Sequence, residues 1–201
     1  MSRLLRGVGK SPAFVDPLAA YLVYDTFTDT NGVTLANHTP DKDTVGTGWL
    51  ANVGGGFTIQ GNALDCNGAN DQFASIDCGA VAASVKVASL VVGNDNGLIA
   101  RSSSGQSCIM VEWAAGRDAI ELYTVNPGYT GIGSYAQAIT AGDAKVNFEL
   151  RYSGNSLTVL DNGTSRVTAT NALNNTLTRV GVFGYSEGGT AGWDTLTAMA
   201  I

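Results

Sequence analysis

Apolar and polar residues alternate with a period of two along most of the chain, which predicts β-strands. The clearest example is the segment KVNFELRYSGNSLTVLDNG, in which every second residue from Val146 to Tyr152 is apolar. Turn residues at 153–156 and at 161–163 bound a return strand that begins at Leu157. We therefore expect a β-hairpin with one face in the core and one face in solvent.

The same alternation marks further segments that are bounded by Gly, Asn, Asp or Pro. These segments are 84–93, 97–103, 107–116, 119–126, 134–140, 166–171 and 179–186. Two earlier segments, 56–68 and 73–79, are expected to pair with each other. Many short strands with regularly spaced turns predict an all-β fold of two antiparallel sheets, stacked as a sandwich and stabilised mainly by burial of their facing sides.

The length and composition agree with this fold class. A chain of 201 residues can bury roughly 70% of the surface that its unfolded form exposes, which is enough for one sizeable core. Only 14% of the residues are charged and 26 are glycine, as is typical of β proteins. We expect one domain at 21–201, preceded by an extended N-terminal arm at 1–20.

Charge is unevenly distributed between the arm and the body. The first ten residues carry +3 through Arg3, Arg6 and Lys10, which leaves 8 basic against 17 acidic side chains, or −9, for the remainder. An acidic body repels nucleic acid and anionic membranes, so neither is an expected partner. The absence of a signal-peptide pattern or a membrane-spanning apolar run predicts a protein that matures in the cytoplasm.

The three cysteines are Cys66, Cys78 and Cys108. In a reducing compartment an odd number of cysteines favours buried free thiols. A bridge between Cys66 and Cys78 is the alternative.

The order of these segments resembles a known family. The opening YDTFTDTNGVTLANHTPD, the segment GTGWLANVGGGFTIQGNAL, the central hairpin and the closing RVGVFGYSEGGTAGWDTLTAMAI look like the concanavalin A-like lectin/glucanase jelly roll in its laminin G-like form. The likeness covers about residues 21–201. Single-domain proteins of this appearance with a short N-terminal arm are common among bacteriophage virion proteins, so the resemblance implies a jelly-roll sandwich in such a particle.

The polar stretch at 25–41 is expected to begin the fold. In a jelly roll of this kind the first and last strands pair near the sheet edge, so Phe27 should pack inward beside Trp193 and Leu196. Residues 29–32 should then form a tight turn, for which Asx side chains are suited.

A calcium site is the functional alternative for the same stretch. Asp25, Asp29 and Asn31 would supply several oxygens within one loop. An EF-hand spacing needs an acid or amide where Phe27 stands, so the turn is favoured. A structural calcium ion is the one cofactor considered, and no other cofactor is expected.

Enzyme motifs can be found but lack their context. The G-x-S-x-G match at 184–188 is followed by a loop and a strand rather than a helix, and the only histidine, His38, precedes Ser186. A glucanase of this fold needs paired carboxylates on one strand. Glu112 and Glu121 are instead isolated acids in separate segments. No cysteine and histidine cluster suits zinc. We expect no enzymatic activity.

Carbohydrate binding is a weaker expectation. Sugar sites combine an aromatic platform with polar partners, and Tyr129, Tyr135 and Tyr185 lie near Gly and Asn. In the alternative interpretation, which we favour, the tryptophans fill the core and these tyrosines line loops.

The arm is expected to attach the domain to a larger assembly. Its sequence lacks periodicity, so it should be disordered in an isolated monomer. We expect its apolar residues to dock into a neighbouring subunit and its basic residues to meet acidic surface there. Crystal contacts that order a terminus are the alternative. The anchor residues are Arg3, Leu4, Leu5, Arg6, Lys10, Phe14 and Val15.

These observations together predict a non-enzymatic structural protein of a bacteriophage virion, either a capsid decoration or a fibre-type surface subunit. Its expected partners are other virion proteins, copies of itself and host surface glycans that it binds weakly. Its expected location is the virion, assembled in the host cytoplasm. A dedicated carbohydrate-binding lectin module is the alternative.

Overall fold

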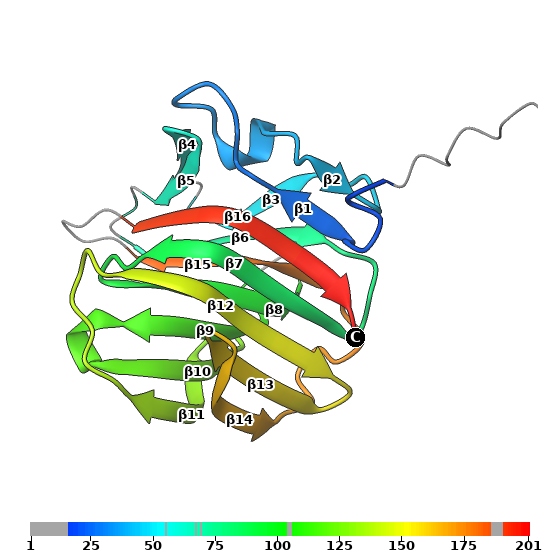
Figure 1. Cartoon of the computed structure of the whole chain (residues 1–201). Helices are drawn as coiled ribbons and strands as arrows, with labels where there is room; N and C mark the ends of the chain where they lie inside the picture. Colours follow the sequence, from blue (N-terminus) through cyan, green and yellow to red (C-terminus); the bar gives the residue numbers. More distant parts are fainter. Residues whose placement is uncertain (1–15, 55, 67, 69, 104–105, 186–190) are drawn as a thin grey trace, which may run out of the picture.

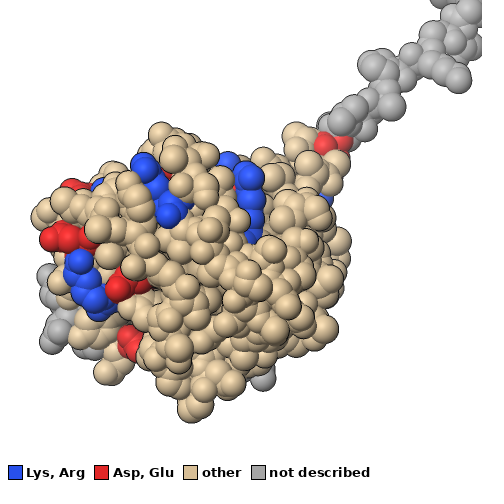
Figure 2. Space-filling view, turned by 90° about the horizontal axis from the view of Figure 1, so that it is seen from below, with Lys and Arg blue, Asp and Glu red and all other residues tan. Residues whose placement is uncertain are grey.

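The computed structural model describes residues 16–54, 56–66, 68, 70–103, 106–185 and 191–201. These residues form two antiparallel β-sheets that pack face to face (Figure 1), which confirms the predicted all-β jelly-roll sandwich. No helix in the described ranges is long and apolar enough to cross a membrane. Most of the surface shown in Figure 2 comes from uncharged residues, as the charged fraction of 14% leads one to expect.

The larger sheet, called here the nine-stranded sheet, contains both ends of the described domain. Its path runs through β14 (Thr164–Thr170), β13 (Ser156–Asp161), β12 (Ala144–Ser153), β7 (Ala83–Val91), β16 (Ala191–Ala200), β1 (Val23–Asp25) and β2 (Lys42–Asp43). A hairpin of β4 (Phe57–Gln60) and β5 (Ala63–Cys66) joins it through β16. The predicted pairing of the first and last strands is confirmed, because β1 lies antiparallel to β16.

The other sheet has seven strands and is called the seven-stranded sheet. Its order is β11 (Tyr129–Ala136), β10 (Ala119–Val125), β9 (Cys108–Ala114), β8 (Asp95–Ser102), β15 (Arg179–Tyr185), β6 (Gln72–Asp77) and β3 (Trp49–Val53). Two short 3-10 turns complete the described elements, η1 (Leu35–Asn37) and η2 (Ala115–Arg117).

Most predicted strands are confirmed, and two predictions need correction. The segment 56–68 contains its own hairpin, β4 and β5, because Gly61 and Asn62 both have the positive φ that a tight two-residue turn requires (59° and 60°). The segment 73–79 therefore pairs elsewhere, as β6 between β15 and β3. The strand predicted at 134–140 runs instead over β11, where a Gly-rich sequence without alternation pairs along β10.

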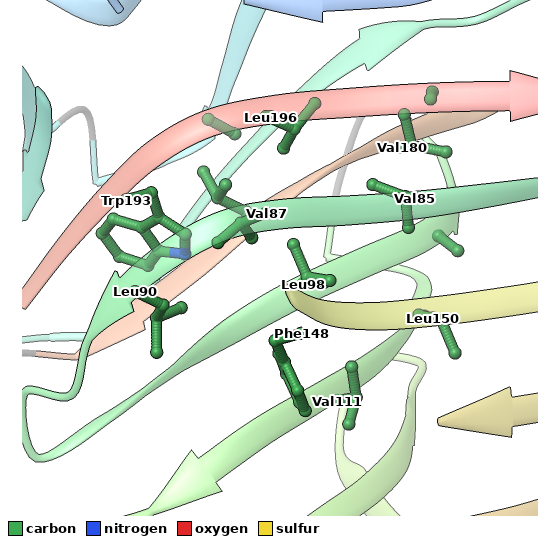
Figure 3. Close-up of a cluster of buried hydrophobic side chains, with 14 of the residues drawn as sticks. Val85, Val87, Leu90, Leu98, Val111, Phe148, Leu150, Val180, Trp193 and Leu196 are labelled. Carbon is green, nitrogen blue, oxygen red and sulfur yellow. The ribbon is translucent and has the colours of Figure 1, made fainter. Parts of the chain in front are cut away.

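The core fills the space between the sheets (Figure 3). Trp113 and Trp193 are fully buried and Trp49 is nearly so, which confirms that the tryptophans belong to the core. Leu98 of β8 and Phe148 of β12 meet across the two layers. Truncating one buried aromatic of this kind to alanine costs about 3–5 kcal/mol, so this layer dominates the stability of the sandwich.

All three cysteines are free and buried, as predicted. Burial raises the pKa of Cys108 to about 12. The thiol therefore stays protonated at neutral pH and behaves as a small apolar side chain.

The alternation in β12 reverses part-way along the strand. Val146, predicted to face the core, is 48% exposed, because Asn147 adopts a left-handed φ of 51° that inverts the alternation. Lys145 points inward in its place and lies 4.9 Å from the ring centre of Trp113. The inward-facing residues resume at Phe148.

Two neighbouring strands reverse at the same level. Thr195 of β16 has a left-handed φ of 51°, and the register places both Thr195 and Asn147 opposite Ala88 of the central strand β7. Along β7 the buried positions shift from Val87 to Leu90 across this point. Three adjacent strands of the nine-stranded sheet therefore change their core-facing side together.

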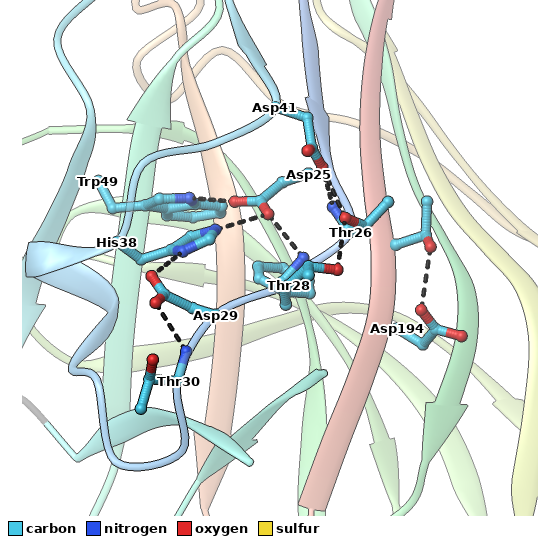
Figure 4. A network of polar contacts seen from close by, with 11 residues as sticks. Asp25, Thr26, Thr28, Asp29, Thr30, His38, Asp41, Trp49 and Asp194 are labelled. Carbon is cyan, nitrogen blue, oxygen red and sulfur yellow. Dashed lines mark hydrogen bonds and ion pairs between the residues drawn. The ribbon is translucent and has the colours of Figure 1, made fainter. Parts of the chain in front are cut away.

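A charged network ties the beginning of the domain to both sheets (Figure 4). The buried carboxylate of Asp25, at the end of β1, accepts hydrogen bonds from Phe27 N at 2.7 Å and from Trp49 Nε1 at 2.7 Å. His38 contacts Asp25 through Nε2 at 2.9 Å and Asp29 through Nδ1 at 3.0 Å. Each ring nitrogen faces a carboxylate, which favours the doubly protonated imidazole, because both nitrogens then donate.

The titration behaviour of the network agrees with this assignment. Burial lowers the pKa of His38, but hydrogen bonds to Asp29 and Asp25 outweigh burial and raise the pKa above its ordinary value. Burial raises the pKa of Asp25 despite its hydrogen bonds. The fully buried ring of Phe27 packs against Trp49 and His38, which confirms its predicted inward position, while Trp193 packs against Phe57.

Thr195→Asn should raise the free energy of unfolding by about 0.5–1 kcal/mol, because a β-branched residue is strained in left-handed backbone and Asn tolerates it. Urea denaturation measures the change. Thr168→Asn, at an exposed position of β14 without positive φ, is the control and should be neutral or slightly destabilising. A loss of stability in Thr195→Asn equal to that in the control would contradict the strain.

The His38 network predicts a pH-dependent stability. The folded-state pKa is raised, so the stabilisation is complete below about pH 6.5 and is lost as the pH rises through the folded-state pKa. His38→Gln should lose about 1–3 kcal/mol at pH 6 and less at pH 9. Glu112 also titrates in this range, so the difference between the two unfolding curves, not either curve alone, reports His38. A difference that does not change with pH would refute the charged imidazole.

Candidate functional site

The outer face of the seven-stranded sheet carries a cluster of charged and aromatic residues. Val111 and Trp113 of β9 and Leu122 of β10 point into the core, so the residues between them point outward. A cleft of about 260 Å³ opens on this outer face. Its lining residues come from β8, β9, β10, β11 and β15 and from two loops: Asp71, Asp95, Met110, Glu112, Arg117, Tyr123, Tyr129 and Phe183.

Three carboxylates converge on one guanidinium at this face. Glu112 and Glu121 are register partners on β9 and β10. Arg117 lies in η2, the turn that joins these strands, and binds Glu121 through Nε and Glu112 through Nη2. The same Nη2 lies 3.5 Å from Asp95 Oδ2. The side chain of Arg117 therefore extends from the turn back over the outer face of β9 and β10.

Negative charge is crowded around Glu112. Burial raises its pKa to about 8, and the charges of Asp95 and Glu121 add to this effect while Arg117 opposes it. Burial also raises the pKa of Asp95. Glu112 therefore gives up its proton at a higher pH than an ordinary glutamate does.

Two tyrosines form the aromatic wall of the cleft. Tyr129 donates its hydroxyl to Asp71, and Tyr123 donates to Glu121 Oε2 at 2.7 Å. Their rings meet edge to face with centres 6.1 Å apart. The Tyr129 side of this wall is open to solvent, since 44% of the residue is exposed.

Gly97 keeps the centre of the face free of side chains. It lies in register between Glu112 of β9 and Phe183 of β15. A Cβ at this position would lie 2.0 Å from the carbonyl oxygen of Val111, so no other residue fits the backbone as it stands. Its own carbonyl accepts a hydrogen bond from Trp193 Nε1 at 3.0 Å, which fixes β8 to the core.

The three predicted sugar-contacting tyrosines are separated in the structure. Tyr129 lines the cleft. Tyr185 packs against the apolar cluster on the same outer face and is the register partner of Asp95. Tyr135 lies toward the other end of β11, where Arg166 of β14 stacks over its ring at 4.9 Å. The cleft therefore contains one of the three.

The other cleft residues carry no sequence signal that predicts a shared site. Glu112 and Glu121 were treated as isolated acids, although they are equally distant from the turn between β9 and β10 and so face each other. Recognising that turn as a tight hairpin would have revealed the pair. Asp71, Asp95 and Arg117 come from separate segments, and nothing in their spacing indicates that they meet.

The predicted calcium ligands have other partners. Asp25 and Asp29 both contact His38, and Asn31 Oδ1 accepts a hydrogen bond from Gly61 N at 2.8 Å. The turn here runs from Thr30 O to Val33 N at 3.1 Å, one residue later than predicted. Across the described ranges no group of three or more His, Cys, Asp or Glu residues is arranged to hold a metal ion.

Some predicted residues lie outside the described ranges. Ser186 of the G-x-S-x-G match is one of them. So are all the anchor residues of the arm: Arg3, Leu4, Leu5, Arg6, Lys10, Phe14 and Val15. Their roles stay predictions.

Comparison by sequence finds no matching protein-family model and no matching curated protein. Comparison by structure finds carbohydrate binding module CBM66 from Bacillus subtilis at 13% identity and a TM-score of 0.65, covering 77% of this chain and 96% of that one. A protein of unknown function with a galectin-like fold from Bacillus subtilis matches at 10% identity and a TM-score of 0.56, covering 85% of this chain and 97% of that one. The Bacillus licheniformis beta-glucanase matches at 10% identity and a TM-score of 0.55, covering 89% of this chain and 97% of that one.

These matches extend over most of this chain and nearly all of each neighbour. At identities of 10–13%, these matches show a shared fold but not a shared activity. The two packed sheets and these neighbours together show that the chain has the concanavalin A-like lectin/glucanase jelly-roll fold.

Proposed function

We propose that this chain binds carbohydrate in the cleft on the outer face of the seven-stranded sheet. The observation that carries the proposal is the wall formed by Tyr123 and Tyr129, whose hydroxyls are held by Glu121 and Asp71. Sugar rings present apolar faces that pack on aromatic side chains, and their hydroxyls donate hydrogen bonds to carboxylates. A cleft of about 260 Å³ is smaller than the roughly 300–1,000 Å³ of pockets for drug-sized ligands and suits one or two sugar rings.

The structural neighbours support the same class of ligand. One is named a carbohydrate binding module and another a beta-glucanase. Both share this sandwich over most of their length. Because one fold hosts many functions, the neighbours only raise the expectation, and the argument rests on the residues of the cleft.

We further propose that binding is not followed by hydrolysis. A glycosidase needs one carboxyl group to donate a proton and a second carboxylate to attack or to activate water. The pKa of about 8 for Glu112 would suit the proton donor, and this favours hydrolysis as the second candidate function. Arg117, however, binds Oε1 of Glu112 and Oε2 of Glu121, so one cation ties the two groups together, which opposes separate roles as proton donor and nucleophile.

Tyr129→Ala should weaken glycan binding about tenfold, because it removes a stacked aromatic contact of about 0.5–1.5 kcal/mol and the hydroxyl that holds Asp71 in place. A glycan array identifies a binder, and titration calorimetry with that glycan measures its Kd. Tyr135→Ala is the matched control: it lies on the same strand but outside the cleft, and its binding should be unchanged. Loss of binding in the control but not in Tyr129→Ala would place the site elsewhere.

We also propose that this binding domain is a surface subunit of a bacteriophage virion, a capsid decoration or fibre-type protein. The support is the sequence resemblance together with a charge of +3 on the first ten residues against −9 on the remainder. A basic segment of this kind complements the acidic body of another copy or another virion subunit. The glycan-binding face would then be displayed outward, toward host surface sugars.

Deletion of residues 1–18 should abolish incorporation into particles while leaving the sandwich folded. Sedimentation of assembled particles measures incorporation, and circular dichroism of the free protein checks the fold. A triple change of Arg3, Arg6 and Lys10 to Ser should weaken incorporation and make it less sensitive to salt. Unchanged incorporation of the deleted chain would defeat the anchoring role.

A further inference from the structure

We propose that the cleft selects sugars that carry an ammonium group, such as glucosamine units, over neutral and acidic sugars. This inference rests on the proposed function, because it names the ligand class of the same cleft. It follows from an inventory of the hydrogen-bond donors, the acceptors and the charges that the cleft presents.

The side-chain donors among the described residues that line the cleft already have partners. Arg117 donates to Glu121 and Glu112 and lies 3.5 Å from Asp95. The hydroxyls of Tyr123 and Tyr129 donate to carboxylates of the same face. A ligand that needs donors from the protein, as a carboxylate, sulfate or phosphate group does, would have to break one of these bonds.

The acceptors are in excess. Each ionised carboxylate can accept about four hydrogen bonds, and the contacts above use only part of that capacity. The Asp95 side chain lines the cleft and is 20% exposed, so its charge acts on a ligand bound there. An acceptor in this position is stabilised by a donor from the ligand, and an ammonium group offers three.

The negative charge of the cleft also favours a cationic sugar. Asp71, Asp95, Glu112 and Glu121 face a single cation, Arg117, among the described residues that line or bridge the cleft. A proton on Glu112 leaves three carboxylates against one guanidinium. A cationic sugar reduces this excess, whereas an acidic sugar increases it.

Three trisaccharides of matched size test the selectivity by titration calorimetry at pH 6.5: triglucosamine, its fully N-acetylated form, and trigalacturonate. Triglucosamine should bind at least about tenfold more tightly than the acetylated trimer, as one charged hydrogen bond allows. Trigalacturonate should not bind. The preference should shrink in 0.5 M salt, because screening weakens a partly exposed ion pair.

Asp95→Asn should reduce the preference for triglucosamine over the acetylated trimer to below about threefold. Asp194→Asn, an exposed acid on β16 of the other sheet, should keep the full preference and serves as the matched control. Equal affinity of the wild type for the two trimers would overturn the ammonium selectivity while leaving carbohydrate binding intact. Tighter binding of trigalacturonate would also overturn it, and binding of none of the trimers or array glycans would overturn both proposals.

Discussion

The antiparallel register of β9 and β10 is the constraint on which the candidate site depends. Each strand gives every second residue to the core, and the residues between have only the outer face to occupy. The register then sets Glu112 directly opposite Glu121. Two like charges opposite each other destabilise a sheet unless something neutralises them. The guanidinium from the connecting turn does so, and the crowded, partly protonated cleft is the result.

The nine-stranded sheet contributes by holding this face in place from behind. At the level of its left-handed residues Asn147 and Thr195, three adjacent strands change the side that faces the core. The His38 network fastens β1 of the same sheet to Trp49 of the seven-stranded sheet. Local strain and buried charge, both unfavourable alone, persist here because well-packed surroundings over-determine them.

Alternation along the chain was enough to predict the sandwich, because a strand with one buried face must repeat every two residues. It failed where the backbone leaves the extended region, as at Asn147, and along the Gly-rich β11, where pairing with β10 replaces side-chain pattern as the cause of the strand. Phe27 was predicted as a core residue from the pairing of first and last strands that the family resemblance implies, and the tryptophans from the tendency of aromatic side chains to fill a sandwich. The cleft was not predicted, apart from Tyr129, because its members are distant in sequence and meet only through sheet order.

The position of Arg117 in a three-residue turn has a consequence for how such a protein can change. The turn lies at the end of the sheet, half exposed, and none of its residues is buried in the core. Exchanging it for another turn of equal length would alter the charge above the sheet while the strands beneath keep their packing. The charge of the cleft can therefore be changed at this turn, provided that the new turn also supplies a cation to neutralise Glu112 and Glu121.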